Sequence, residues 1–235
     1  MLTGGRAEVK NMALGAGPVH ESGRKSLSPL KKAALRSKIK FPFNPSWRSN
    51  TVKAIAAVEP GRVEVVEIDP PPYEDYECLV RVRASGLCNS TDLKILDDHI
   101  SDEGVEYPCV LGHESVGEVV EVGSKVRNIE VGDRFTNPLG RLAPGCEYGC
   151  MWGAMKEYAI VQDRRVMDDY EEGDPLYGGP HTLPIPREMD FHDGAVVLTL
   201  KECLSALKNF GFRSGMDVLV YGDGPVGMGL AKFMQ

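Results

Sequence analysis

Two short segments of the sequence carry side chains that could hold a metal ion together. Cys88 lies in the run Gly-Leu-Cys-Asn-Ser-Thr-Asp, and His113 is followed directly by Glu114. Thiolate, imidazole and carboxylate groups are the usual ligands of Zn²⁺, and catalytic zinc sites keep three protein ligands and one open position. A lone cysteine and a lone histidine are more often structural residues. The pair therefore predicts a zinc site only together with further motifs.

A glycine-rich turn near the end of the sequence could bind a dinucleotide. Gly222, Gly224 and Gly227 fit the pattern G-x-G-x-x-G, with Pro225 and Val226 inside it. The first glycine permits a tight turn, the second lets the backbone approach a pyrophosphate, and the third lets helix and strand pack closely. The following helix then offers free N–H groups to the phosphates. A plain tight turn between a strand and a helix is the alternative.

Short strands must position the first two segments. From residue 53 the chain shows β-branched or alternating runs separated by turns, and this spacing predicts a compact β-barrel-like domain. A short helix is expected over 91–96, immediately after Cys88. The strands are expected over 53–58, 62–68, 78–84, 115–122, 131–135 and 156–161.

Helical and parallel-sheet patterns follow these strands. The acidic segment 163–187 is interpreted as a surface loop, which could shape the access of a substrate or be only solvated. A helix over 191–209, an apolar strand over 217–221 and a helix from residue 228 predict the start of a Rossmann domain. The expected fold class is therefore mixed α/β. Residues 1–51 form a basic leader, residues 52–190 the barrel domain, and residues 191–235 an incomplete Rossmann domain.

Charge divides the chain into two parts. Residues 1–50 contain ten Lys and Arg but two acidic residues and so carry +8, whereas residues 51–235 carry −15, for a net charge of −7. The Gly, Ser and Pro content of the leader cannot bury enough apolar surface to order it, apart from a short helix near 29–40. A disordered extension is favoured over a targeting peptide or a tail for nucleic acid or membrane surfaces. One hypothesis takes Val52 as the natural first residue.

Composition restricts the classes of function. Hydrophobic residues make up 42% of the chain, but no run approaches the roughly 18 apolar residues of a membrane span. The acidic body argues against nucleic acid as a partner. No signal-peptide core and no disulfide framework are visible, so a cytoplasmic location is expected. Cys78, Cys109 and Cys203 are expected to be small buried residues.

The motifs occur together and in a fixed order. Gly-Leu-Cys…Asp is followed by Gly112-His113-Glu114, by Val-Gly-Asp-Arg-Phe over 131–135, and by the glycine turn. From residue 52 to residue 235, this joint pattern resembles the zinc-containing medium-chain alcohol and polyol dehydrogenases, including threonine and sorbitol dehydrogenase-like members. The resemblance implies a GroES-like domain, then a Rossmann domain, and hydride transfer between an alcohol or polyol and NAD or NADP with the assistance of zinc.

The resemblance also assigns roles to single residues. It makes Cys88 and His113 zinc ligands and Glu114 a ligand or close neighbour. It makes Asp92 the residue that orients His113. A hydroxyl near Cys88 would pass the substrate proton to solvent.

The spacing after Cys88 departs from the family pattern. Three residues separate Cys88 from Asp92, where family members usually have two. The relay hydroxyl could therefore come from Ser90 or from Thr91. Thr91 is favoured because it directly precedes Asp92.

The remaining ligands depart from the pattern as well. The usual third-ligand position falls near Leu198, which cannot bind zinc, and Glu202 one helical turn further on is the candidate. The family's structural zinc lobe, with four closely spaced cysteines, is reduced to Cys146 and Cys150. We therefore expect one catalytic zinc and no structural zinc.

The length of the chain raises two rival hypotheses. Eight residues follow Gly227, whereas a six-stranded Rossmann domain needs roughly a hundred more. A zinc-dependent oxidoreductase is expected when a further C-terminal part completes the fold, with a homo-oligomer as an option for that form. One rival is a non-catalytic fragment that binds zinc. The other is a zinc-free quinone or enoyl reductase, which Cys88 and His113 argue against.

Overall fold

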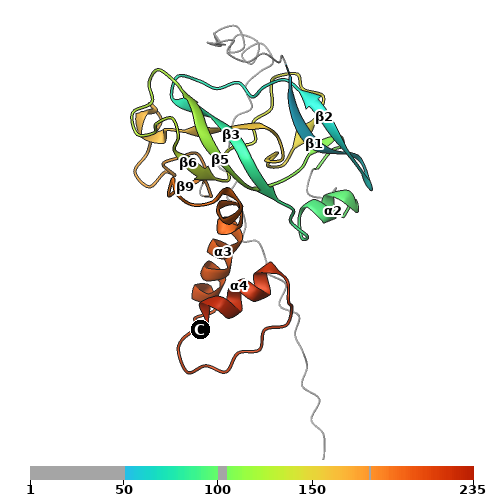
Figure 1. Cartoon of the computed structure of the whole chain (residues 1–235), viewed down its shortest axis with the longest axis vertical. Coiled ribbons are helices and arrows are strands. Elements are labelled where there is room, and N and C mark those ends of the chain that lie inside the picture. Colours follow the sequence, from blue (N-terminus) through green and yellow to red (C-terminus); the bar gives the residue numbers. More distant parts are fainter. Residues whose placement is uncertain (1–50, 100–104, 180) are drawn as a thin grey trace, which may run out of the picture. The chain divides into compact units, whose positions relative to one another are not determined.

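A computed structural model describes residues 51–99, 105–179 and 181–235 (Figure 1). The leader and its short helix near 29–40 lie outside the described residues. Within the described part, no helix combines the length and the apolar character that crossing a membrane requires. The described chain contains a strand-rich part followed by two longer helices.

The first sheet has four strands in the order β2-β1-β4-β7. Strands β1 and β2 form an antiparallel hairpin around Gly61, whose φ of 75° suits a residue without a side chain. Val52, Ala54 and Ala56 of β1 are buried and alternate with exposed residues, as expected for a strand with one face on the core. The strands are β1 (Val52–Glu59), β2 (Arg62–Ile68), β4 (Cys109–Val110) and β7 (Gly149–Cys150).

The second sheet has five strands in the order β8-β3-β5-β6-β9. Its two longest strands, β3 and β5, pair in antiparallel fashion and carry the site described below. The six strands predicted from the sequence are all present with shifted ends, whereas β4, β7 and β9 were not predicted. The strands are β3 (Glu77–Gly86), β5 (Glu114–Val122), β6 (Arg134–Thr136), β8 (Tyr158–Gln162) and β9 (Leu183–Ile185).

Residues 156 and 157 join the two sheets. Lys156 forms a bridge with Ala54 of β1, and the backbone N–H of Val82 in β3 donates to the carbonyl of Glu157. One cluster of buried side chains lies beneath each sheet, and the largest fully buried side chain is Phe135. This closed arrangement confirms the predicted GroES-like barrel.

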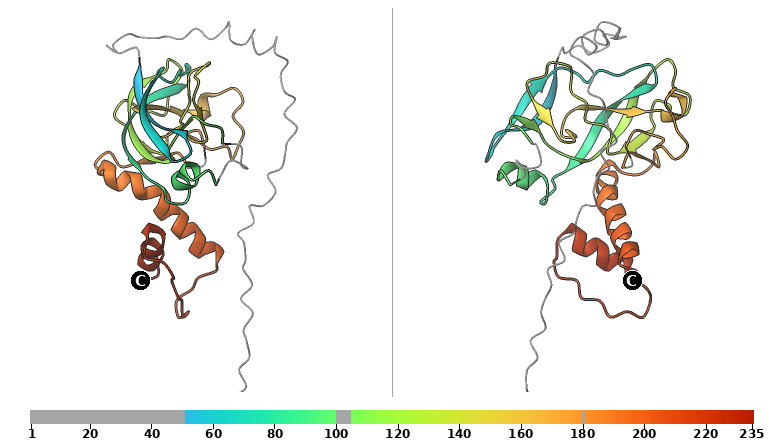
Figure 2. Two further views of the ribbon diagram at one scale, coloured as in Figure 1. Left: turned by 90° about the vertical axis from the view of Figure 1, so that its right-hand side faces the viewer. Right: turned by 180° about the vertical axis from the view of Figure 1, so that it is seen from behind.

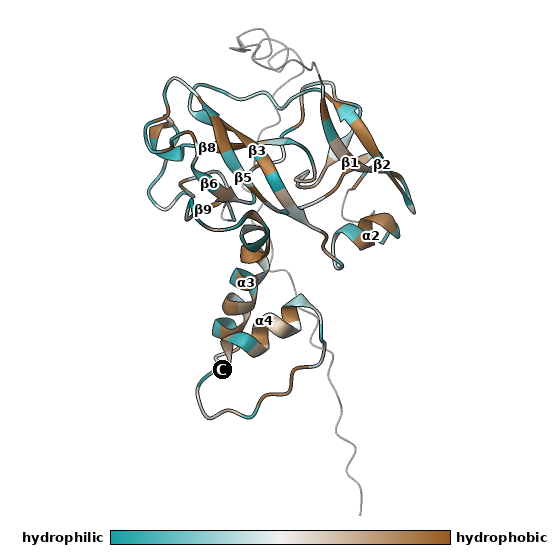
Figure 3. Ribbon diagram, viewed as in Figure 1, coloured by the Kyte–Doolittle hydropathy of each residue, from teal (hydrophilic) through white to brown (hydrophobic). Residues whose placement is uncertain are grey.

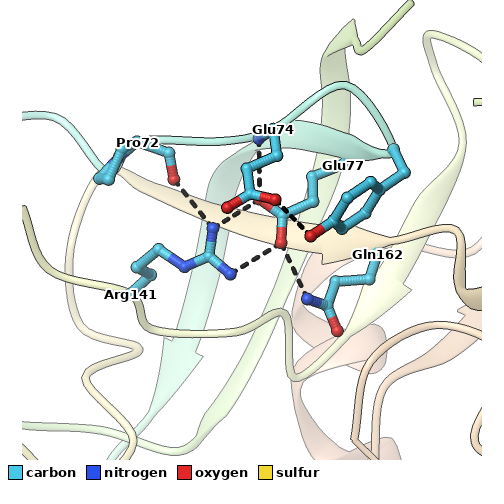
Figure 4. A network of polar contacts seen from close by, with 6 residues as sticks. Pro72, Glu74, Glu77, Arg141 and Gln162 are labelled. Carbon is cyan, nitrogen blue, oxygen red and sulfur yellow. Dashed lines mark hydrogen bonds and ion pairs between the residues drawn. The ribbon is translucent and has the colours of Figure 1, made fainter. Parts of the chain in front are cut away.

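A buried ion pair ties β3 to the loop that precedes β7 (Figure 4). The carboxylate of Glu77 is completely buried and accepts two hydrogen bonds, of 2.5 and 2.7 Å, from the guanidinium of Arg141. The side chain of Gln162 and the backbone N–H of Glu74 donate to the same carboxylate. The charge is therefore fully compensated, which a buried carboxylate requires.

The acidic segment after β8 is only partly the surface loop that the sequence predicts. It contains a short 3₁₀ helix, η2 (Arg164–Val166), and β9. Its first residue, Asp163, is buried and accepts hydrogen bonds from the backbone of Arg127 and Asn128. The expectation was wrong for Asp163 because these N–H donors replace water around its carboxylate.

Three helices accompany the strands. Helix α2 (Asp92–Leu96) follows Cys88, and helix α3 (Phe191–Asn209) packs against β3, β5 and β6. The Asp190 side chain caps α3 by accepting from the N–H of His192. Helix α4 (Pro225–Phe233) packs against α3.

The predicted strand over 217–221 is not formed. Figure 2 shows a long loop between α3 and α4, and Figure 3 shows that part of it is strongly hydrophobic. Leu219 and Tyr221 are almost fully exposed. A strand needs a hydrogen-bonded neighbour, and no described strand pairs with this segment. The apolar run therefore remains without regular structure.

The glycine turn keeps the close packing expected of its motif. Gly222 has a φ of 132°, and a Cβ atom on Gly227 would overlap the carbonyl oxygen of Gly222. Gly224 is the N-cap of α4, with Pro225 in the first turn, where proline is well tolerated. The third glycine therefore permits a close approach within the turn, whereas the predicted packing of a strand on the helix is not formed.

Candidate metal centre

The register of β3 and β5 brings together the segment that contains Cys88 and the segment that contains His113. Gly86 at the end of β3 pairs with Glu114 at the start of β5. Cys88 follows Gly86 by two residues, and His113 precedes Glu114 by one. Antiparallel pairing therefore places both segments at the same end of the sheet.

Three side chains converge at this end. The ligand atoms of Cys88, His113 and Glu114 all lie within 4.8 Å of one another. All three residues are partly buried, so the site is shielded but still reachable. Among the described residues, these three side chains form a group of His, Cys, Asp or Glu residues that could hold a metal ion together.

Asp92 holds the backbone of both segments. Its carboxylate is completely buried and accepts from the backbone N–H of Cys88 at 2.8 Å and from that of Gly112 at 3.0 Å. The sequence hypothesis gave Asp92 the task of orienting His113. The hydrogen bonds of its carboxylate go to the backbone of Cys88 and Gly112, so Asp92 acts on His113 through the preceding residue.

Tight packing fixes the turn before His113. Gly112 has a φ of 90°, and a Cβ atom there would overlap the Met155 side chain. The ring of Trp152 lies against the ring of His113, with centroids 5.0 Å apart. The packing at Gly112 thus fixes the backbone before His113, and Trp152 supports one side of the imidazole.

His113 has a nitrogen that lacks a protein partner. Its Nδ1 atom is buried and has no hydrogen-bond partner in the described part of the chain, and its Nε2 atom lies 3.8 Å from Oε1 of Glu114. A buried polar atom without a partner costs free energy, and a bound metal ion would organise this imidazole. Together with a thiolate and a carboxylate, the group fits Zn²⁺.

The two candidate relay hydroxyls differ in their surroundings. The hydroxyl of Ser90 lies 3.2 Å from the Cys88 sulfur and is exposed to solvent. Thr91 occupies the N-cap position of α2, and its side chain makes no capping hydrogen bond. The sequence slightly favoured Thr91, whereas the geometry places Ser90 at the thiol.

Glu202 does not join the group. It is exposed on α3 and lies outside the set of ligand atoms that converge around Cys88. Leu198 is buried in the same helix, and the next residue, Thr199, donates a hydrogen bond of 3.1 Å to Oε1 of Glu114. Helix α3 therefore contacts the site through a hydroxyl.

Sequence reasoning missed Trp152 and Thr199. An exposed aromatic residue in a loop and a threonine on the buried face of a helix carry no recognisable signal by themselves. The sequence also predicts that three cysteines are small buried residues and that the remaining histidines are surface or packed residues, and the described residues agree with both predictions. Cys78, Cys109 and Cys203 are buried, and His99, His181 and His192 are exposed. His20 lies outside the described residues.

The glycine turn adjoins an apolar cavity. Gly222, Gly224 and Gly227 line a cavity of about 450 Å³ together with the side chains of Leu207 and Leu230. The cavity lies between α3, α4 and the loop that joins them. Its lining includes residues 218–221, which belong to the predicted strand.

Comparison with known proteins supports the family suggested by these features. Residues 74–169 match the alcohol dehydrogenase GroES-like domain. The chain is 26% identical to D-xylulose reductase of Saccharomyces cerevisiae, over 76% of this chain and 51% of that protein. It is 29% identical to L-threonine 3-dehydrogenase of Pyrococcus horikoshii, over 77% and 52%. The chain thus spans about half the length of these relatives.

Solved structures share the fold. An alcohol dehydrogenase of Escherichia coli CFT073, solved with NADH, superposes with a TM-score of 0.59 at 22% identity, covering 79% of this chain and 53% of that one. This likeness concerns the fold, since the identity is low. The match to the GroES-like domain and the similarity to these relatives support a relationship of this chain to the zinc-type medium-chain polyol dehydrogenases.

Proposed function

We propose that the chain supplies the metal-binding half of a zinc-dependent oxidoreductase that transfers a hydride between a small alcohol or polyol and NAD or NADP. The observation that carries this proposal is the convergence of Cys88, His113 and Glu114 within 4.8 Å. The resemblance to the alcohol and polyol dehydrogenases supports an alcohol dehydrogenase-like oxidoreductase activity. The names of the curated relatives, a xylulose reductase and a threonine dehydrogenase, support small hydroxylated substrates.

In this proposal, Cys88, His113 and Glu114 hold Zn²⁺. When bound, Zn²⁺ acts as a Lewis acid that lowers the pKa of a coordinated alcohol. Glu202 is left out because it is exposed and lies outside the group. The absence of a structural zinc at Cys146 and Cys150 stays a prediction, and so does the cytoplasmic location.

Residues around the three proposed zinc ligands have supporting roles in this proposal. Asp92 fixes the backbone of Cys88 and Gly112, and Trp152 supports the imidazole of His113. We assign the relay of the substrate proton to Ser90, because its exposed hydroxyl connects the thiol end of the site with solvent. The glycine turn 222–227 would receive the pyrophosphate of the nicotinamide cofactor, as the NADH bound to the E. coli neighbour supports.

A cobalt-substituted chain tests the proposal. Co²⁺ replaces Zn²⁺ in such sites and gives visible absorption bands that respond to a change of ligand. We expect bands with thiolate-to-metal charge transfer that are lost in Cys88→Ser and that shift when xylitol or a simple secondary alcohol is added. Bands that do not respond to a large excess of either alcohol would count against alcohol binding at this metal and favour a non-catalytic metal site.

A further inference from the structure

The carboxylate of Glu114 is held by a helix that provides no metal ligand of its own. Thr199 in α3 donates its hydroxyl hydrogen to Oε1 of Glu114 in β5 at 3.1 Å. The two residues are 85 positions apart in the sequence. Thr199 is 8% exposed, and the side chain of Glu114 is 15% exposed. The hydrogen bond is therefore largely protected from competition by water.

The threonine hydroxyl uses its single hydrogen for this contact. In helices a threonine hydroxyl commonly donates to a carbonyl of the preceding turn, whereas that of Thr199 is directed across to another element. Its β-branched side chain has only two common χ1 rotamers in a helix, and the one adopted by Thr199 directs the hydroxyl to Glu114. Few alternative positions are therefore open to this donor.

The second oxygen of Glu114 has room beside it. A Cβ atom on Gly86 would lie 3.0 Å from Oε2 of Glu114, so a side chain at position 86 would crowd an oxygen that the glycine leaves unobstructed. A carboxylate has about four lone-pair directions, and the Thr199 hydroxyl takes one of them at Oε1. Thr199 therefore restrains one oxygen of the carboxylate and leaves lone pairs for a metal ion.

We propose that Thr199 is a positioning residue that holds Glu114 in place as the third protein ligand of the metal centre. The inference rests on the metal site of the proposed function. It explains how α3 takes part in the site although Leu198 and Thr199 cannot supply a strong zinc ligand. Because α3 also packs against α4, the same helix contacts the metal ligand and the element that follows the glycine turn.

Zinc affinity of purified variants tests the inference, measured by competition with a chromophoric chelator. Thr199→Val keeps the shape and removes the donor, and we expect its zinc affinity to fall by roughly 10- to 100-fold. Thr199→Ser retains a hydroxyl and is expected to recover most of the affinity. Thr182→Val is the matched control, because Thr182 is equally buried but donates to the carbonyl of Asn137. It should bind zinc like the unchanged chain.

A spectroscopic readout separates positioning from general destabilisation. In the Co²⁺-loaded chain, loss of a fixed carboxylate should change the band positions in Thr199→Val and leave them unchanged in Thr182→Val. In a Glu114→Ala background, Thr199→Val should cause no further loss of affinity, because the residue acts through Glu114. If Thr199→Val does not fold, Thr199→Ala gives the same comparison with a better helix former.

The outcomes are distinct. Thr199→Val that binds zinc and shows cobalt bands like the unchanged chain would overturn the inference and leave the proposed metal site intact. Equal losses in Thr199→Val and Thr182→Val would also overturn it, since they would indicate a merely structural effect. An unchanged chain that binds no zinc would instead overturn the proposed function itself.

Discussion

The Oδ2 atom of Asp92 accepts a hydrogen bond of 2.8 Å from the backbone N–H of Cys88. Its other oxygen accepts from the N–H of Gly112, the residue before His113. One buried carboxylate thus fixes the two segments that carry the thiol and the imidazole. We therefore expect the proposed metal centre to depend on this anchor as well as on its three donor side chains.

Replacement of Asp92 should weaken metal binding without removing a ligand. In Asp92→Asn the amide NH₂ must face one of the two N–H donors, so one segment loses its anchor. We expect zinc affinity to drop by roughly 10- to 100-fold, measured by chelator competition. Asp97→Asn, an exposed residue just after the same helix, is the control. Unchanged affinity in Asp92→Asn would show that the anchor is unimportant.

Lys156 gives the stability of the fold a distinct pH dependence. The side chain is only 4% exposed, and burial lowers the pKa of its ammonium group from 10.5 to about 8. Between these values the unfolded chain binds more protons than the folded chain, so the free energy of unfolding should rise with pH from about 8 to about 10.5. The rise attributable to Lys156 should be roughly 3 kcal/mol at most.

Urea denaturation over this pH range measures the effect of Lys156. In Lys156→Met the rise should be smaller than in the unchanged chain, whereas the exposed Lys125→Met should keep it. Identical pH profiles for the unchanged chain and Lys156→Met would contradict the prediction. The comparison with a variant is needed because cysteine and tyrosine side chains of an unfolded chain titrate in the same range.

The pair formed by Glu77 and Arg141 should behave as a buried, coupled unit. Arg141→Met leaves the completely buried Glu77 carboxylate without its counter-charge, and we expect a loss of about 3–5 kcal/mol in the free energy of unfolding. Glu77→Leu should cost less, because the Arg141 side chain is 32% exposed and water can solvate its guanidinium. The double variant should lose clearly less than the two single losses together. Additive losses in urea denaturation would argue against a direct coupling.

Two glycines at the start of α4 should respond differently to alanine. A Cβ atom would overlap the Gly222 carbonyl at Gly227, but it would meet nothing within 4 Å at Gly224, where φ is −75°. Gly227→Ala should therefore loosen α4 by roughly 1–3 kcal/mol, seen as faster hydrogen exchange of the Leu230–Phe233 amides. Gly224→Ala replaces only the N-cap residue and should increase that exchange much less. Equal exchange in both variants would contradict the packing described for Gly227.

The barrel was predictable because its signals are local. Alternation in Val52, Ala54 and Ala56 and the turns around Gly61 identify strands without knowledge of their partners. The strand over 217–221 failed for the opposite reason, since an apolar run forms a strand only beside another one. Asp163 was misassigned because its acidic neighbours suggested solvent, whereas its partners are backbone groups 35 and 36 residues away.

The candidate metal ligands could be predicted from the sequence, but the residues that hold them in position could not. Cys88, His113 and Glu114 have the donor chemistry of a zinc site, and the joint pattern of motifs along the chain singled them out. Thr199 and Trp152 reach the site only through the packing of a helix and of a loop, which no short pattern encodes. The same limit applies to Glu202, whose place one turn after Leu198 does not decide which way its side chain points.

Zinc content tests the central claim most directly. The purified chain, saturated with Zn²⁺ and freed of excess metal, should contain one equivalent by elemental analysis. Cys88→Ser and His113→Ala should contain almost none, and Cys146→Ser should still contain one. Less than half an equivalent in the unchanged chain, or a content that Cys88→Ser leaves unaltered, would contradict the assignment of this site.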